Sequence, residues 1–208
     1  MKHLKKGNFI FIFNGIKKRV LSKNEAYGLR RDLTQPFENP KALIQIHIRP
    51  VEKGDNTFFS SDNFNIGILS AKLQTCYIAT DDGGTPCYRQ WLMASGENSK
   101  IERFWKGLFP ILKSDEALLE NAFTIPDFRG KRVMPAAMAL IAEKGHKLGA
   151  RYILTFVDIN NIPSLKGCKR SGFSPYTLRT EKWFLFNRTI TFSELTQENA
   201  NHFIQQTS

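Results

Sequence analysis

Stretches of apolar residues with strand-like spacing recur through the middle of the chain. Leu43 to Arg49 alternates apolar and polar residues, and Tyr152 to Val157 is a continuous run rich in β-branched and aromatic residues. Alternation is typical of a strand with one buried face, and a continuous run is typical of a strand buried on both faces. Cys76–Thr80 and Pro86–Ala94 flank Asp81-Asp82-Gly83-Gly84, which predicts a hairpin because glycine supplies the positive φ of a tight turn. A further strand is predicted over Glu116–Thr124, just before Pro126.

Helices are predicted where the strand patterns stop. The clearest covers 133–148, which is rich in alanine and is followed by Gly149 at the position where a helix commonly ends. The capping-box spacing of Ser22-Lys23-Asn24-Glu25 predicts a helix over 22–33. The remaining predicted elements are helices over 160–171 and 193–205 and strands over 9–13 and 182–192.

The order of these elements predicts an α/β fold of the α+β type, with a mixed central sheet flanked by helices. A chain of 208 residues is expected to form one domain over 1–208. Hydrophobic residues make up 41% and charged residues 24%, which excludes a disordered, collagen-like or coiled-coil chain. The net charge of +11 is typical of a domain that meets nucleic acid, acidic lipid or a phosphate-rich small molecule.

The cysteines and histidines indicate neither a disulfide framework nor a metal site. There are three cysteines and four histidines, and their spacings match no zinc or paired-histidine motif. We therefore expect no bound metal and a location in the reducing cytoplasm. No apolar run approaches the roughly 20 residues of a spanning helix, so we also expect no membrane insertion.

The segment Phe123-Thr124-Ile125-Pro126-Asp127-Phe128-Arg129-Gly130-Lys131-Arg132-Val133-Met134 carries the clearest chemical signal. A predicted strand leads into a turn with one glycine and three cations, and a predicted helix follows. Backbone N–H groups and the positive end of the helix dipole together favour an anion, most naturally a phosphate or pyrophosphate. An ordinary basic turn that binds nothing would have the same composition.

The second informative segment runs from Val157 to Phe173. Together with the basic turn it resembles the GNAT family of acyl-CoA N-acyltransferases, over roughly 118–173. The family has a Q/R-x-x-G-x-G/A loop that holds the CoA pyrophosphate, and Arg129 matches its first position. Its later Asn-x-Pro-Ala-Leu and Gly-Phe pattern is matched by Asn161, Pro163, Ser164, Leu165, Gly172 and Phe173.

This chain departs from the family pattern at three positions. Arg132 and Met134 stand where the loop has glycines, and Cys168 stands where the family has a tyrosine. A Cβ in place of hydrogen makes the loop path wider, but the backbone N–H groups remain available. Arg132 adds a charge that a phosphate can contact.

The resemblance implies where acyl-CoA would bind. The pantetheine arm would lie beside the strand Asn121–Ile125, and a backbone N–H of Phe123 or Thr124 would polarise the thioester carbonyl. The implied cofactor-binding residues are Phe123, Thr124, Ile125, Arg129, Gly130, Lys131, Arg132, Val133, Met134, Asn161 and Ser164. The implied cofactor-binding core spans about 116–175.

Catalysis would need a group that takes the amine proton and a source of a proton for the leaving thiolate. Glu120 is the first candidate base, although the family's carboxylate aligns nearer Asn121, so Glu120 requires a strand bulge that reorients it. Asp158 and Glu116 are alternatives. Cys168 is the candidate acid, with a small buried side chain as the competing interpretation.

Polar groups beside aromatic side chains, at Tyr88, Gln90 and Trp91, suit a sugar or a nucleobase. The segments 87–93 and 163–170 are more loosely similar to a GNAT branch that acylates nucleotide-linked amino sugars for surface polysaccharides. Residues 22–112 and the C-terminal strands would then bind the acceptor. Other open interpretations are a protein, peptide or small-amine acetyltransferase and a non-catalytic GNAT-fold module. Scattered cations and the absence of a recognisable motif argue against nucleic acid, and a homodimer remains open.

Overall fold

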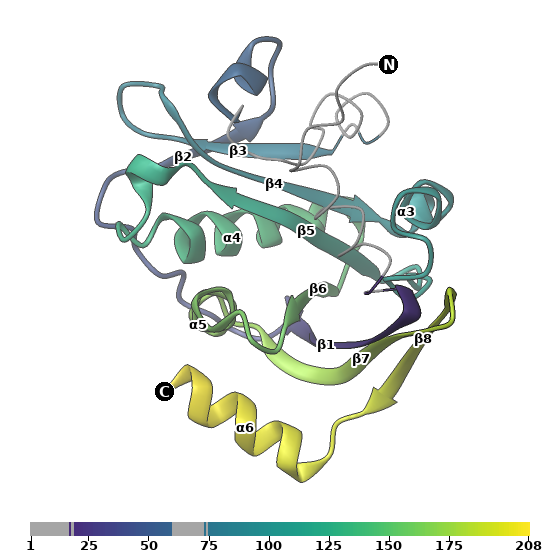
Figure 1. Cartoon of the computed structure of the whole chain (residues 1–208). Coiled ribbons are helices and arrows are strands. Elements are labelled where there is room, and N and C mark those ends of the chain that lie inside the picture. Colours follow the sequence, from purple (N-terminus) through teal and green to yellow (C-terminus); the bar gives the residue numbers. More distant parts are fainter. Residues whose placement is uncertain (1–16, 18, 60–72, 74) are drawn as a thin grey trace, which may run out of the picture.

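The structure is a computed structural model and describes residues 17, 19–59, 73 and 75–208. Within these residues, eight strands form one mixed sheet in the order β2-β3-β4-β5-β6-β1-β7-β8 (Figure 1). The strands are β1 Leu21–Asp32, β2 His47–Pro50, β3 Cys76–Thr80, β4 Pro86–Ala94, β5 Glu116–Thr124, β6 Tyr152–Asp158, β7 Ser174–Phe184 and β8 Asn187–Glu194. The longer helices are α3 Asn98–Trp105, α4 Val133–Glu143, α5 Ile162–Arg170 and α6 Gln197–Thr207. This confirms the predicted fold class.

Helices cover both faces of the sheet. Leu119 of β5 packs in a cluster with residues of α4, α5 and α6, whereas its neighbour Leu118 packs in a second cluster with Ile101 of α3. Successive strand residues point to opposite faces, so these two leucines identify the two sides of the sheet. The helix α4 lies along β4 and β5 (Figure 1).

Most elements predicted around the basic turn are confirmed. The hairpin of β3 and β4 and the strands β5 and β6 have the expected places, and α5 covers most of 160–171. The predicted helix over 133–148 is α4 followed by a 3₁₀ turn over Lys144–Leu148. Gly149 ends this turn with φ 73°, a left-handed conformation that favours glycine. The strand predicted over 9–13 lies outside the described residues.

The helix predicted over 22–33 is wrong, because this segment is the long strand β1. β1 pairs antiparallel with both β6 and β7 and is therefore a central strand. Its run of buried residues, Ala26 to Leu29, fills both faces of the sheet. A short apolar run fits a buried strand as well as a helix, and the capping-box spacing is a weaker constraint than two strand partners. A Cβ on Gly28 would lie 2.8 Å from the ring of Phe156, so only glycine allows this close packing.

The strand predicted over 182–192 is in fact two strands. β7 and β8 pair antiparallel and are joined by a two-residue turn, Leu185-Phe186. The terminal helix predicted over 193–205 begins later, at Gln197, after Thr196 caps it. No glycine, asparagine or proline occupies the turn itself, so none of the residues that usually mark a turn indicates that the strand reverses there.

The alternation over 43–49 predicts a strand correctly only at its end. β2 begins at His47, whereas the N–H of Leu43 donates to the carbonyl oxygen of Lys131 beside α4. Ile44 and Ile46 pack on the core while their neighbours are exposed. The alternation therefore indicates that one face of the segment 43–49 packs on the core. Its first half does so without pairing in the described sheet.

Candidate functional site: a gap between two parallel strands

The neighbouring parallel strands β5 and β6 separate part-way along their length. They pair only from Glu116 to Leu118 on β5, opposite Tyr152 to Leu154 on β6. Beyond these residues the edge of β5 that faces β6 has no strand partner among the described residues. The sheet therefore opens into a gap, and the backbone groups along it are available to another chain-like molecule.

The carboxylate of Glu120 lies inside this gap. The backbone N–H of Phe156 on β6 donates to Oε1 of Glu120 at 2.6 Å, and Oγ1 of Thr155 lies 3.2 Å from the same oxygen. The second oxygen, Oε2, has only a long contact of 3.4 Å from its neighbour's N–H on Asn121. One carboxylate oxygen thus replaces the missing strand pairing, and the other has room for a further partner.

A bulge at Asn121 places Glu120 there. The register between β4 and β5 shifts by one residue between Arg89 and Trp91, so β5 has one extra residue opposite Gln90. Asn121 has φ 58°, the left-handed conformation that a β-bulge can require. The condition under which Glu120 can face the site, a bulge in this strand, is therefore present. Among the described residues, Nδ2 of the half-buried Asn121 has no hydrogen-bond partner.

The gap opens onto a cavity of about 220 Å³, here called the strand-gap cavity. Polar side chains from three strands and α5 line it, together with two methionines of α4 and one cysteine. The lining residues are Gln90, Glu120, Asn121, Ala122, Met134, Met138, Thr155, Phe156, Val157, Asp158, Asn161, Ser164 and Cys168. The cavity can therefore hold a polar molecule next to the Glu120 carboxylate.

Burial raises the pKa of Glu120 to about 7, which the N–H of Phe156 and the charge of Arg179 oppose only in part. A carboxyl group with this pKa exchanges protons near neutral pH, as a general base must. Asp158 also lines the cavity, but its Oδ1 accepts the N–H of Asn160 at 2.8 Å. Glu116 does not line the cavity, and its Oε2 accepts the N–H of Lys113.

Cys168 lies at the cavity wall but is almost fully buried. Its Sγ lies 3.8 Å from Sδ of Met138, and burial, reinforced by the nearby Glu120, raises the pKa of its thiol. A thiol with a raised pKa is a poorer proton donor than an ordinary cysteine. This geometry favours the packing interpretation of Cys168.

The three residues predicted to bind the acceptor are all buried, and only Gln90 lines the cavity. Tyr88 is one step removed, since its hydroxyl donates to Oε1 of Gln90 at 2.6 Å. Trp91 points to the opposite face of the sheet and packs beside Met93 and Ile101 in the α3 cluster. The predicted direct contacts of Tyr88 and Trp91 with the acceptor are therefore corrected. Tyr88 lies on the same face as Gln90 but is fully buried behind it, and Trp91 faces the other side because neighbouring strand residues point to opposite faces.

The basic turn forms a second cavity at the N-terminus of α4. This cavity of about 300 Å³, the turn cavity, is lined by Thr124, Phe128, Arg129, Gly130, Arg132, Val133, Met134, Pro135, Pro163, Gly167 and Arg170. Gly130 and Arg132 have φ of 77° and 57°, and no side chain caps α4. Uncapped helix N–H groups beside three arginines make an anion-binding arrangement.

Arg170 is the cation that the sequence interpretation missed. It comes from the last turn of α5, and only the packing of α5 against α4 brings it beside Arg129 and Arg132. Lys131, in contrast, does not line the turn cavity; its Nζ lies over the ring of Phe128 at 4.9 Å. The turn cavity therefore has three cations, as many as the turn itself carries, but Arg170 of α5 takes the place of Lys131.

Met134 lines both cavities and lies between them. Its thioether packs against Gly167 of α5 so closely that a Cβ on Gly167 would lie 2.9 Å from Cε of Met134. The position that the family pattern gives to a small residue is thus filled by a flexible side chain. Methionine has three rotatable bonds, so it can repack when the space beside it is used.

Four other predicted cofactor residues lie outside the turn cavity, and the side chains of two of them point away from both cavities. Phe123 and Ile125 pack against the buried Phe59 and Ile78 on the opposite face of the sheet, so only their backbone faces the gap region. Asn161 and Ser164 line the strand-gap cavity and not the turn cavity. The side chain of Asn161 accepts the N–H of Ser164 at 3.3 Å and thereby caps α5.

The described residues include no group of three or more histidine, cysteine, aspartate or glutamate side chains that could hold a metal ion. All three cysteines are buried and unpaired. None of the described helices is both long and apolar enough to cross a bilayer.

The raised pKa of Glu120 predicts how stability depends on pH. Between about pH 4.5 and 7 the unfolded chain ionises this group while the native protein keeps it protonated, so the wild type loses stability as pH rises. Glu120→Gln keeps an oxygen for the N–H of Phe156 but does not ionise. We expect it to be more stable than wild type above pH 7, by up to about 3 kcal/mol, and the difference to vanish below pH 4.5.

Urea unfolding across pH 4 to 9 measures this difference, with Glu38→Gln, at an exposed carboxylate, as the control. If both variants followed the wild-type pH dependence, the Glu120 carboxyl would not be desolvated.

Comparisons with known proteins give a fold and no close relative. No protein-family profile matches the chain, and no curated protein matches its sequence. One similar solved structure is the GCN5-related glucosamine N-acetyltransferase region of a fungal multi-domain β-N-acetylglucosaminidase, with TM-score 0.58 and 13% identity over 87% of this chain and 23% of that chain. A second is a GNAT-family acetyltransferase from Colwellia psychrerythraea, with TM-score 0.54 and 10% identity over 92% of this chain and 63% of that chain.

A third is a tandem GNAT protein from the clavulanic acid biosynthesis pathway, with TM-score 0.51 and 11% identity over 94% of this chain and 61% of that chain. The chain thus spans less than two thirds of each of these three proteins. At such low identity the likeness concerns the fold. The mixed sheet, the opened pair β5 and β6 and the turn before α4 accordingly belong to a chain with the fold of the GNAT acetyltransferases.

Proposed function

We propose that this protein is an acyl-CoA-dependent N-acyltransferase that acts on a primary amine. The observation that carries the proposal is the Glu120 carboxylate, which lies in the gap between β5 and β6 with a pKa of about 7 and with one oxygen held only by a long 3.4 Å contact. A packing or capping carboxylate would have no need of a bulged strand, an adjoining polar cavity and a pKa near neutrality together.

The chemistry is direct attack of the amine on the thioester. The nitrogen lone pair forms the C–N bond, the C–S bond breaks, and the sulfur leaves with the bonding electrons as thiolate. The amine loses one proton, which Oε2 of Glu120 accepts directly or through a water molecule. The thiolate takes a proton from solvent, since the buried thiol of Cys168 is a poor donor.

Donors around the gap fit the charge that develops on the thioester oxygen. The unpartnered Nδ2 of Asn121 borders the strand-gap cavity, and the backbone N–H groups near Phe123 and Thr124 follow on the same strand. Fixed donors in a buried site stabilise an oxyanion without reorganising. The unpaired edge of β5 is suited to the amide groups of a pantetheine arm, which would add as a short strand.

The phosphates of CoA would bind at the turn cavity. Arg129, Arg132 and Arg170 provide charge, and the first N–H groups of α4 have no side-chain cap. Met134 stands between this cavity and the gap, so the cofactor would displace its thioether sideways. The two cavities thereby separate the tasks of holding the cofactor and positioning the reacting groups.

For the acceptor we propose an amino sugar carried on a nucleotide, in the reducing cytoplasm. Amide, hydroxyl and carboxylate groups of Gln90, Thr155, Asp158 and Ser164 line the strand-gap cavity and suit the hydroxyl groups of a sugar. The net charge of +11 suits a second pyrophosphate beside that of CoA. Peptide or small-amine acetylation is the alternative to be tested against it.

The acceptor assignment predicts the outcome of a coupled assay. Acyl-CoAs are incubated with nucleotide-linked amino sugars, the same sugars without the nucleotide, polyamines and lysine peptides, and free thiol is detected. We expect the nucleotide-linked sugars to give the highest kcat/KM because they offer both hydroxyl groups and phosphates. A clear preference for peptides or polyamines would reject the amino-sugar acceptor but support N-acyl transfer. Thiol release at the same rate with and without any amine would reject both the acceptor and the N-acyl transfer.

The assignment of Glu120 as base predicts a change in the pH profile. The wild-type rate should rise with pH through about 7, and Glu120→Gln should lower it by about 10²-fold or more, with partial recovery at high pH where the amine is already neutral. Cys168→Ser, in the wall of the same cavity, should keep most of the turnover. A comparable loss in Cys168→Ser with the fold intact would make that thiol the acid, and an unchanged profile in Glu120→Gln would leave Asp158 or solvent as the base.

The phosphate site predicts which cofactor fragments bind. Calorimetry should show CoA binding much more tightly than pantetheine, and Arg170→Ala should weaken CoA at least about tenfold while leaving pantetheine unchanged. Lys169→Ala removes the same charge from the neighbouring residue of α5, outside the turn cavity, and is the matched control. Equal affinities for CoA and pantetheine would exclude phosphate binding at this turn.

A further inference from the structure

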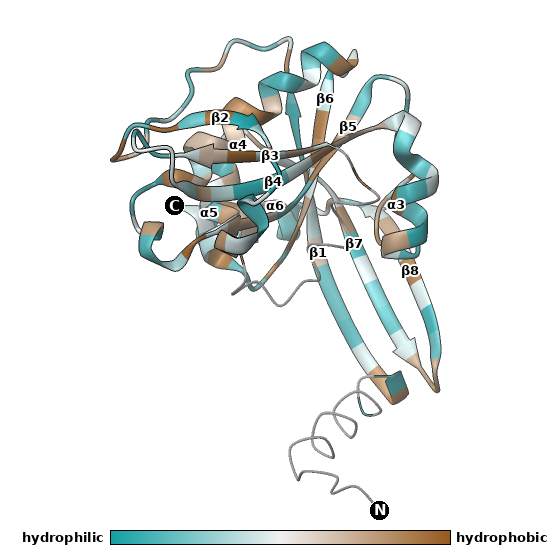
Figure 2. Cartoon of the chain, turned by 90° about the horizontal axis from the view of Figure 1, so that it is seen from above, coloured by the Kyte–Doolittle hydropathy of each residue, from teal (hydrophilic) through white to brown (hydrophobic). Residues whose placement is uncertain are grey.

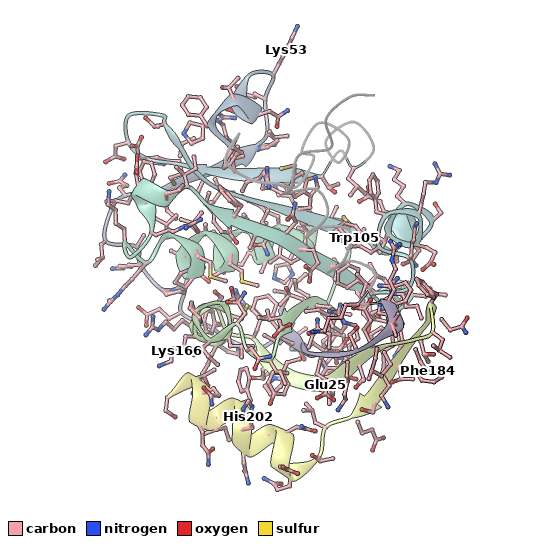
Figure 3. The ribbon with its side chains drawn as sticks, in the orientation of Figure 1. Glu25, Lys53, Trp105, Lys166, Phe184 and His202 are labelled. Carbon is pink, nitrogen blue, oxygen red and sulfur yellow. The ribbon has the colours of Figure 1, made fainter. Side chains whose placement is uncertain are left out.

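The ends of β1, β7 and β8 project from the body of the protein and carry an apolar tip. Figure 2 shows the three strands extending together, with hydrophobic residues at their far end. The tip, defined here as Leu21, Phe184, Leu185 and Phe186, has exposed fractions of 72%, 62%, 58% and 58%. Figure 3 shows Phe184 at the end of this hairpin, away from the core. Four large apolar side chains in one exposed group usually mark an interaction site.

The turn at the tip has the wrong residues for its conformation. Leu185 and Phe186 have φ of 44° and 67°, the left-handed region that a two-residue hairpin turn requires. Asparagine and glycine are preferred there because a bulky side chain is strained. With 58% of their surface exposed, these two side chains gain little packing energy to offset the strain. Such uncompensated strain is expected where the residues themselves are needed for contact with a partner.

The backbone donors of this turn are nevertheless satisfied. The N–H of Leu185 donates to the carbonyl oxygen of Val20 at 2.9 Å, and the N–H of Phe186 donates to that of Arg19 at 2.8 Å. An element that enters an apolar medium must satisfy its polar backbone groups internally. The tip therefore meets this requirement for the N–H groups of both central residues.

Residue types change in order with distance from the tip. The first row behind the turn pairs Leu21 with Phe184, the second pairs Ser22 with Trp183, and the third pairs Lys23 with Lys182. Each row adds about 3.3 Å, so the sequence from apolar to aromatic to cationic extends over about 10 Å. Elements that lie at a bilayer surface bury their apolar part to about 5–10 Å, with tryptophan and cations at the headgroups.

The charges nearest the tip are mostly positive. Residues 19–24 and 182–189 contain no aspartate or glutamate, and the first acid along β1 is Glu25, whose Oε1 lies 2.8 Å from Nζ of Lys23. Arg19 and Arg188 both lie 5.9 Å from the ring of Trp183. The nearest acid along β7, Glu181, is buried and accepts Nε of Arg188 at 2.6 Å. The partner should therefore be apolar at its centre and anionic around it.

We propose that this tip docks on an anionic lipid bilayer, inserting the side chains of Leu21 and Phe184–Phe186 beneath the headgroups. Trp183 then lies at the headgroup level, and Arg19 and Lys182 contact lipid phosphates, whereas Lys23 is already paired with Glu25. The contact is peripheral and needs no spanning helix. It is independent of the proposed acyl transfer, because the tip and the strand-gap cavity have no lining residue in common.

The test uses the intact chain and vesicles of phosphatidylcholine alone or with phosphatidylglycerol. The key variant is Leu185→Asn with Phe186→Gly, which removes half of the tip, leaves the net charge unchanged and installs the turn residues that this conformation prefers. It should fold at least as well as wild type. We expect wild type to co-sediment with the anionic vesicles and the variant to bind them at least about tenfold more weakly. Leu43→Asn, at a residue that is 65% exposed beside α4, should bind like wild type.

Two further readouts make the result decisive. Lipids brominated on their acyl chains should quench wild-type fluorescence, and Trp183→Phe should lose most of that quenching. Equal binding of wild type and the double variant would overturn the proposal, since the net charge alone would then explain adsorption. So would the absence of binding at low salt, or a wild-type dimer that becomes monomeric in the double variant, which would assign the tip to a second copy.

Discussion

A single hydrogen bond across the sheet, from the N–H of Phe156 to the carboxylate of Glu120, underlies the arrangement of the site. Parallel strands normally satisfy each other's backbone groups, so two that separate leave donors without acceptors. Here the carboxylate of Glu120 on β5 accepts the hydrogen bond that a backbone carbonyl oxygen of β5 would accept in a continuous pair. The gap can therefore remain open without an orphaned donor at Phe156, and the group that keeps it open is also the one best placed to exchange a proton.

That arrangement requires the bulge at Asn121. In a regular strand Glu120 would keep its alternating position, and its carboxylate would point to a face of the sheet instead of along it. The left-handed residue at the bulge redirects the chain just as β5 leaves β6. After the bulge, β5 ends at Thr124, and the chain continues through Pro126 into the arginine-lined turn. The segment that leaves β6 therefore connects the strand-gap cavity to the turn cavity.

The helices and strands of the site could be predicted from the sequence better than the contacts between them. Local patterns of apolar residues, caps and glycines predicted β5, the basic turn, α4, β6 and α5. The cofactor-binding roles implied for the residues around Arg129 and Asn161 stay predictions. Arg170 could not be found in this way, because it reaches the turn cavity only when α5 packs on α4. The two-residue period of a strand implies that Trp91 and Gln90 point to opposite faces of the sheet. It does not indicate which of the two points toward the cavity, because that depends on which helices cover each face.

The largest error, at β1, concerns non-local pairing. No local pattern within Leu21–Asp32 indicates that this segment pairs with both β6 and β7. The capping-box spacing at its start instead favours a helix. This insertion gives the molecule a particular order of assembly. β1 is synthesised more than a hundred residues before its partners β6 and β7, and such distant pairings form slowly. β1 supports β6, the strand that carries Phe156, from the side opposite the gap, and β7 pairs with the other edge of β1. A nascent chain halted before β7 would contain every residue that lines the strand-gap cavity but would lack the second strand partner of β1.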